Sequence, residues 1–193
     1  MTNFAPKTID ANSRSAGAPV LAGAAVILIV ILLFASIAYV PVGSVGVLSL
    51  FGRITGEILP AGTHFVSPFK INNNLSIQTQ TQEEHTSTPS SEGLNLEMDT
   101  SLIYHLNPKK AADVYQTLGT HYAPIIIDPN LRSIIRDTTA GHSANTLYSS
   151  PRKQVEDEIM EGLKKVLEPR GIIIENVLVR DIQLSHRIHP SFK

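Results

Sequence analysis

An uncharged stretch near the amino end most constrains this chain. No charged side chain occurs between Ser15 and Gly52, and Val20–Val40 is a run of 21 apolar or small residues broken only by Ser36. A helix rises about 1.5 Å per residue, so about 20 apolar residues are needed to cross a hydrocarbon core about 30 Å thick. The run therefore predicts a transmembrane helix, with a flexible tail over residues 1–19. The anchor residues expected along it are Val20, Ile29, Phe34, Tyr39 and Val40.

A cleavable secretory signal is the alternative interpretation of this stretch. The apolar core of such a signal usually has about 7 to 15 residues and ends at small residues. Here the run is longer and ends in Tyr39, Val40 and Pro41. Because an interfacial aromatic followed by a helix-stopping proline suits a retained helix, the sequence favours an uncleaved anchor.

The flanking charges predict an orientation. Lys7 and Arg14 precede the run, whereas the first charge after it is Arg53. Because basic residues next to a span tend to stay in the cytoplasm or matrix, we expect the tail there and the remainder of the chain across the membrane.

The remainder, about 150 residues from Val42 onward, has the size of one domain or two small lobes. It holds 14 of the 16 basic and 16 of the 17 acidic residues, with both signs interspersed. Since nucleic-acid binding requires a basic patch, we expect no nucleic-acid partner. The chain has no cysteine, which excludes disulfides, thiol nucleophiles and thiolate metal sites.

Short apolar and alternating segments predict the strands. Val45–Phe51 and Ile54–Leu59 indicate a strand, a turn and a strand. Leu75–His85 alternates with period two and predicts a strand whose polar face carries Gln78, Gln80 and Gln82. The longer alternation over Leu94–Leu106 predicts the central strand of an antiparallel sheet. A final strand over Ile172–Leu184 is interrupted near Arg180 and Asp181, which indicates a bulge or an exposed edge.

Three segments repeat apolar residues at helical spacing. They are Pro108–Leu118, Tyr122–Thr138 with a kink or restart at Asp128 and Pro129, and Pro151–Leu167. Because strands and helices are grouped and not alternated, we expect the part of the chain after the apolar run, which we call the head, to have an α+β fold. Its first lobe, mainly β, is expected over 42–107, and its second lobe, with the helices and the final strand, over 108–193.

The chain contains no glycine-rich phosphate loop, and its nearest approach to a nucleophile elbow is Gly141–Asn145. There Asn145 replaces the last glycine, and the segment lies between helices instead of after a strand. We expect an interhelical turn capped by Ser143, with a serine hydrolase using His142 and Ser143 as the alternative.

The histidines give no metal motif. His64, His85, His105, His121 and His142 are far apart, and no pair has the zinc-protease spacing. His186 and His189 are three residues apart; surface histidines after a strand are the default interpretation, and a shared pair of metal ligands is the alternative. We therefore expect no catalytic residue, no metal site and no cofactor.

The segment GEILPAGTHFVSPF, residues Gly56–Phe69, resembles the start of an SPFH domain, the domain of stomatins, prohibitins, flotillins and HflK/HflC. The residues that match the family element G-x-H-F-x-x-P-F are Gly62, Thr63, His64, Phe65, Pro68 and Phe69. The Thr-His-Phe form is most similar to prohibitins. Later segments also match, and together they extend the resemblance over about Val42–Phe192.

The resemblance implies a non-enzymatic scaffold in a bacterial plasma, inner or thylakoid membrane, or in the mitochondrial inner membrane. Its partners would be membrane lipids, other copies or a paralogue in a ring or cage, and an AAA membrane protease of the FtsH type. Exposed Arg132 and Arg136 are candidate oligomer contacts. Family members continue into a coiled coil, which we expect to be missing after Lys193. A stomatin-type regulator of a channel or transporter, with a membrane hairpin, is the alternative within the family.

Overall fold

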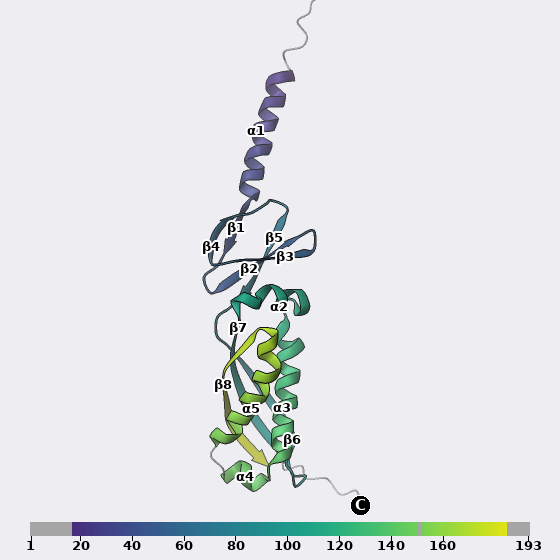
Figure 1. The fold of residues 1–193 in the computed structure, drawn as a ribbon, viewed down its shortest axis with the longest axis vertical. Helices are drawn as coiled ribbons and strands as arrows, with labels where there is room; N and C mark the ends of the chain where they lie inside the picture. Colours follow the sequence, from purple (N-terminus) through teal and green to yellow (C-terminus); the bar gives the residue numbers. More distant parts are fainter. Residues whose placement is uncertain (1–16, 150–151, 185–193) are drawn as a thin grey trace, which may run out of the picture.

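The computed structural model describes residues 17–149 and 152–184. A straight helix, α1 (Gly17–Ala35), extends from one end of an elongated head (Figure 1). A lobe of short strands follows it, and a longer lobe of strands and helices lies beyond.

The first lobe consists of two small antiparallel sheets. In one, β1 (Ile37–Val40) pairs with β4 (Gly62–Phe65). In the other, β2 lies between two neighbours, the order being β3 (Arg53–Leu59), β2 (Ser44–Leu50) and β5 (Lys70–Ser76). The β2–β3 hairpin turns at Phe51 and Gly52, which have φ angles of 48° and 80° as a tight hairpin turn requires.

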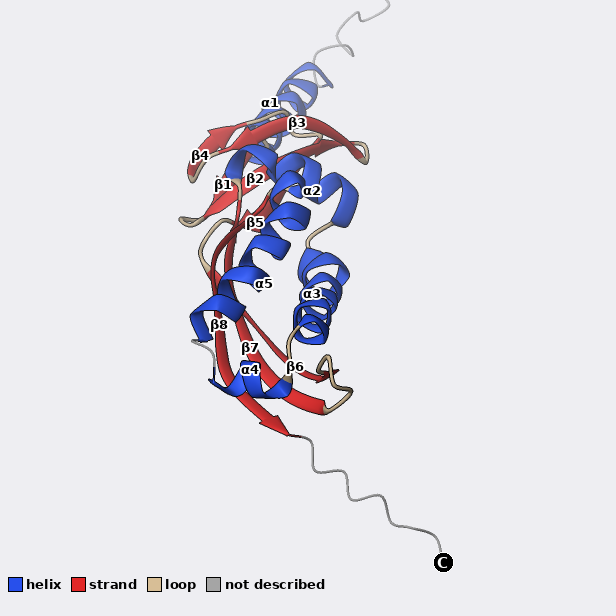
Figure 2. Cartoon of the chain, turned by 60° about the horizontal axis from the view of Figure 1, so that its bottom comes forward, coloured by secondary structure: helices blue, strands red, loops and turns tan. Residues whose placement is uncertain are grey.

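The second lobe contains one three-stranded antiparallel sheet, in the order β6 (Gln80–Pro89), β7 (Asn95–Leu106) and β8 (Ile172–Leu184). The helical segments between β7 and β8 are a 3₁₀ turn (Pro108–Lys110), α2 (Ala111–Leu118), a π-helical turn (Ala123–Ile127), α3 (Asp128–Gly141), α4 (Ala144–Ser149), α5 (Arg152–Leu167) and a 3₁₀ turn (Glu168–Arg170). Figure 2 shows α3 and α5 on one face of the sheet, while no described helix covers the other face.

The core lies between β7 and the helices. The inward-facing side chains of β7, buried to 2% exposure or less, are Leu96, Met98, Thr100, Leu102, Tyr104 and Leu106. The stripe of α5 that faces the sheet, also buried, consists of Val155, Ile159, Leu163 and Leu167. These two patterns confirm the predicted central strand and the clearest of the predicted helices.

Other predictions are confirmed with added detail. Pro108–Leu118 is helical and ends at Gly119, whose φ of 73° suits a helix stop. The restart predicted at Asp128 is the junction between the π-helical turn and α3. The register of β7 against β8 shifts at Arg180, as expected for a bulge, and shifts again at Glu175.

The predicted helix over Val20–Val40 is wrong in its carboxyl-terminal part. The helix ends at Ala35, and Ile37–Val40 is strand β1. The hydroxyl group of Ser36 donates a hydrogen bond to the carbonyl oxygen of Leu32 (2.9 Å). The next residues, Ile37–Val40, pair with β4. Val40 is fully buried in the head, so it is not an anchor residue.

Three further predictions need correction. Leu75–His85 is not one strand, because β5 ends at Ser76 and β6 begins at Gln80 in a different sheet. The lobe boundary therefore lies at residues 77–79 and not at 107, since β6 and β7 share a sheet with β8. The turn predicted after Gly141 includes an additional short helix, α4.

Candidate functional site

The surface of α1 is apolar on all sides. Described large side chains along it are exposed, from Leu21 through Ile29 to Phe34, which is 73% exposed. A helix that is apolar all round requires an apolar environment. Among the residues that the structure describes, no helix is both long and apolar enough to cross a membrane.

Exposed aromatic side chains continue this apolar surface onto the first lobe. Phe65 (78% exposed) lies opposite Ile37 across the β1–β4 pair, and an apolar hollow of about 200 Å³ is lined by Leu33, Phe34, Ile37 and Phe65. Phe51 (82% exposed) contacts Phe69, with ring centroids 6.1 Å apart. Phe51 holds a left-handed backbone conformation that is unfavourable for a bulky residue. The first lobe therefore presents aromatic side chains to its surroundings.

The remaining residues of the Gly62–Phe69 motif shape the backbone. Gly62 pairs with Val40 at the end of the β1–β4 ribbon, with Thr63 next to it opposite Tyr39. The Nε2–H of His64 donates to the carbonyl oxygen of Pro60 (2.8 Å). Pro68 lies in the turn that the hydrogen bond from Lys70 N–H to the Ser67 carbonyl closes (2.9 Å). His64 thus has a structural partner, whereas both phenylalanines of the motif point outward.

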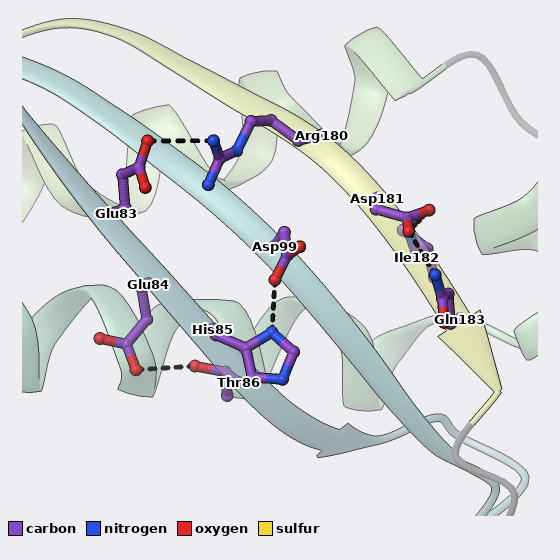
Figure 3. Close-up of polar contacts among 9 residues, drawn as sticks. All are labelled: Glu83, Glu84, His85, Thr86, Asp99, Arg180, Asp181, Ile182 and Gln183. Carbon is purple, nitrogen blue, oxygen red and sulfur yellow. Dashed lines mark hydrogen bonds and ion pairs between the residues drawn. The ribbon is translucent and has the colours of Figure 1, made fainter.

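In the second lobe, an ion pair joins α3 to β6. The guanidinium of Arg132 donates to both carboxylate oxygens of Glu84, from Nε at 2.9 Å and from Nη2 at 3.2 Å. Glu84 is only 9% exposed and also accepts from the hydroxyl of Thr86 (2.9 Å), as Figure 3 shows. Arg132, predicted as an oligomer contact, is therefore engaged within its own head.

Two more polar contacts lie along the same line. The side chain of Gln80 donates to the Tyr122 hydroxyl (3.1 Å), and the hydroxyls of Thr88 and Thr139 share a hydrogen bond. Burial raises the pKa of Tyr122 and raises that of Tyr104, next to Gln80, to about 12. We call the contacts Gln80–Tyr122, Glu84–Arg132 and Thr88–Thr139 the α3–β6 polar seam.

One carboxylate beside this seam is poorly solvated. Burial, and after it the charge of Glu84, raises the pKa of Asp128, while Arg132 acts in the opposite direction. One buried carboxylate oxygen of Asp128 has no hydrogen-bond partner in the described part of the chain. Among the described residues, the nearby guanidinium of Arg132 favours the charged form of this carboxylate.

The uncovered face of the sheet carries ion pairs between strands. Arg180 of β8 donates to Glu83 of β6 (3.0 Å), across β7 (Figure 3). His85 of β6 contacts Asp99 of β7, and this hydrogen bond raises the pKa of His85. This face is polar, and its described ion pairs tie the three strands together.

The geometry around Gly141–Asn145 does not assemble a nucleophile and its base. Ser143 accepts from the backbone N–H of Thr146 (3.1 Å), as a capping residue does, and its hydroxyl bonds to that of Thr146 (2.8 Å). The imidazole of His142 instead pairs with Glu158 (2.8 Å), and this hydrogen bond lowers the pKa of Glu158. A Ser–His hydroxyl activation would need these two side chains bonded to each other.

Within residues 17–149 and 152–184 no group of three or more histidine or acidic side chains is arranged to hold a metal ion. His186 and His189 lie outside the described residues. Val20, predicted as an anchor residue, lies in α1, but its side chain is not described.

The polar seam is the arrangement that sequence reasoning missed. Gln80 and Gln82 were expected on the polar outer face, but they and Glu84 face α3, while Thr81 and Glu83 point outward. An available signal was the run of polar residues at both parities of Gln80–Thr88, which is unusual for a strand with one buried face.

The comparisons with known proteins agree with the fold. Residues 38–193 match the SPFH domain / Band 7 family. No curated protein matches the chain. The match starts in β1, includes the Gly62–Phe69 motif, and covers both lobes of the head. The chain therefore belongs to the SPFH domain / Band 7 family.

Proposed function

We propose that this protein is a membrane-anchored scaffold without enzymatic activity, held in the bilayer by α1 and assembling through its head. The observation that carries the proposal is the apolar surface that α1 exposes on all sides. Proteins of the SPFH family are typically membrane-associated and generally act as scaffolds, which supports the same role.

The aromatic side chains of the first lobe support a position of the head at the membrane surface. Tyr39 and the three exposed phenylalanines Phe51, Phe65 and Phe69 lie on the lobe adjacent to α1. The carbonyl of Ser36, next to α1, accepts from Val66 N–H (2.8 Å), which holds the Phe65–Phe69 segment near the helix end. Aromatic rings are favoured at the membrane–water interface, so these four would contact lipid head groups.

The direction of insertion is a finer part of the proposal. Lys7 and Arg14 precede α1, and the first charge after it is Arg53. This asymmetry supports a tail on the cytoplasmic or matrix side and a head on the opposite side. Protection of each end from added protease, in sealed vesicles, tests it.

Assembly and partners are the other finer part. A ring of identical heads repeats one heterologous contact, so each copy needs two different complementary surfaces. We propose a large oligomer of this chain or of this chain with a paralogue, enclosing or regulating an AAA membrane protease of the FtsH type. Family membership supports this role.

An arginine substitution in α1 tests the anchor. Ile29→Arg places a charge near the middle of α1, which costs about 2.5 to 3.5 kcal/mol for insertion at a bilayer centre. We expect carbonate extraction to release this variant from membranes. Ile125→Arg is the matched control, because Ile125 on the head and Ile29 are each 55% exposed; it should stay membrane-bound. Equal retention of both variants would refute the anchoring role of α1.

Native electrophoresis of gently solubilised membranes tests assembly. We expect the natural protein to migrate as a large complex together with a membrane protease. Migration as a monomer without a protease would refute the scaffold proposal while leaving the anchor result intact.

A further inference from the structure

The two outer edges of the sheet in the second lobe differ. At the β8 edge, three backbone N–H groups donate to side-chain oxygens at 2.9–3.0 Å: Val177 to Asn176, Val179 to Glu156 and Ile182 to Asp181. The carbonyl oxygen of Arg180 accepts from the guanidinium of Arg152 (3.2 Å). Side chains thus occupy the positions that another strand would take, and two bulges interrupt the edge further.

The β6 edge has no such protection. β6 is ten residues long and pairs with β7 along its whole length, without a register shift. Among the described residues, no side chain is hydrogen-bonded to the backbone of Gln80–Pro89. Pro89 at its last position is the one residue that cannot donate a hydrogen bond. A long, regular and uncapped edge is a template for another strand.

The outward side chains of β6 are polar and leave its backbone hydrogen-bonding groups accessible. Its outward face carries exposed Thr81, Glu83, His85 and Ser87. Its inward face is held by the polar seam to α3 and to Tyr122, which precedes α3 in the chain, so the strand keeps its position without an apolar surface. Pairing with a partner would therefore come mainly from backbone hydrogen bonds.

An exposed arginine lies on the side of α3 that contacts β6. Arg132 bonds Glu84 and Thr139 bonds Thr88, so the side of α3 that contains both runs along β6. Arg136 is one helical turn beyond Arg132 on that side and is exposed. It has no ion-pair partner among the residues that the structure describes. The helix thus presents an unpaired positive charge beside an unpaired strand edge.

We propose that the outer edge of β6 binds an extended segment of a partner protein, which adds as a fourth strand and places an acidic side chain beside Arg136. A second copy is a poor occupant. The β8 edge of a second copy is capped by side chains. Two β6 edges paired antiparallel around Glu84 would bring the two Glu84 side chains towards each other, and likewise the two Arg136 side chains, so that like charges would repel. This proposal does not depend on membrane anchoring or on ring assembly.

Hydrogen exchange with short peptides tests the proposal on the full chain in detergent micelles. The probes are three synthetic peptides, Thr-X-Val-X-Val-X-Thr, with X as Glu, Gln or Lys. We expect the Glu peptide to slow amide exchange within Gln80–Thr88, and the Lys peptide to have no effect. The Glu peptide with N-methyl groups on alternate residues should fail to bind, because it lacks the edge donors.

Variants separate the charge from the edge. A charge-assisted hydrogen bond predicts that Arg136→Glu weakens binding of the Glu peptide about ten-fold or more, while Arg136→Lys retains most of the affinity. Arg170→Glu, which reverses an exposed charge at the far end of α5, is the matched control and should bind normally.

Three results would overturn the proposal. One is unchanged exchange across β6 with every peptide up to about 1 mM, a concentration that detects even weak association. The second is equal binding of the Glu peptide to Arg136→Glu and to the unmodified protein. The third is protection of β6 that rises with protein concentration in the absence of peptide, because it would assign the edge to a second copy.

Discussion

The crossing of α3 and α5 depends on Gly162, and we predict that adding one methyl group there destabilises the head. A Cβ built at Gly162 would lie 2.9 Å from Cγ2 of Ile134 and 3.6 Å from its Cδ1. Real Cβ atoms do not approach carbon at 2.9 Å. Because β-branched side chains have essentially one χ1 rotamer in a helix, Ile134 cannot turn its Cγ2 away.

Two opposing terms set the magnitude. Alanine is favoured over glycine in a helix interior by about 1 kcal/mol. Overpacking at a tight contact costs about 1 to 3 kcal/mol. Gly162→Ala should therefore destabilise the head by about 0 to 2 kcal/mol, against the stabilisation that helix propensity alone predicts.

A double-mutant cycle isolates the contact. Ile134→Val keeps Cγ2, so Gly162→Ala should remain unfavourable in that background. Ile134→Ala removes Cγ2, so there Gly162→Ala should stabilise the head by about 1 kcal/mol. The free energy of unfolding would be measured by urea denaturation followed by circular dichroism, in detergent. If Gly162→Ala has the same effect in all three backgrounds, the close approach to Ile134 is not the cause.

Two other measurements test the core and an exposed ion pair. Leu163 is fully buried on α5, so Leu163→Ala should cost about 2 to 5 kcal/mol and lower the melting temperature by roughly 4–20 °C; an unchanged melting temperature would contradict the burial. The hydrogen bond to Asp99 raises the pKa of His85 above 6.5, and an NMR titration should show that Asp99→Asn returns it towards that value. Because the folded-state pKa is the higher one, the stabilisation is present below about pH 6.5 and is lost as pH rises through the folded-state pKa.

The second lobe could be predicted well because its patterns are long. Leu94–Leu106 alternates over enough residues to identify both its burial and its central position, and Val155–Leu167 repeats at helical spacing over three turns. Over such lengths the two periods cannot be confused.

The uncharged stretch could not be divided in the same way. Residues 36–40 are as apolar as those before them, and hydropathy alone does not distinguish an apolar helix from an apolar strand. What ends the helix is pairing of β1 with β4, whose residues lie about 25 positions further along the chain. Such a contact is not visible in a local pattern.

The polar face of β6 was misassigned for a related reason. Side chains alternate along a strand only while the strand is continuous, and the break at residues 77–79 resets the alternation. Gln80 therefore points toward Tyr122, on the side opposite to the one predicted from Leu75.

Arg132 and Arg136 of α3 are alike in the sequence pattern but differ in their contacts in the structure. Both are exposed residues on the side of α3 that runs along β6, but Arg132 pairs with Glu84, which is 9% exposed, whereas Arg136 has no ion pair among the described residues. Removing one partner of a buried pair leaves an uncompensated charge, and reversing it adds repulsion. Arg132→Glu should therefore lower the melting temperature of the head sharply, because Glu84 and Asp128 would face a third carboxylate. Arg136→Glu should leave it almost unchanged. Equal melting temperatures for the two variants would mean that Glu84 finds another partner, and that the α3–β6 polar seam does not hold the helix on the strand.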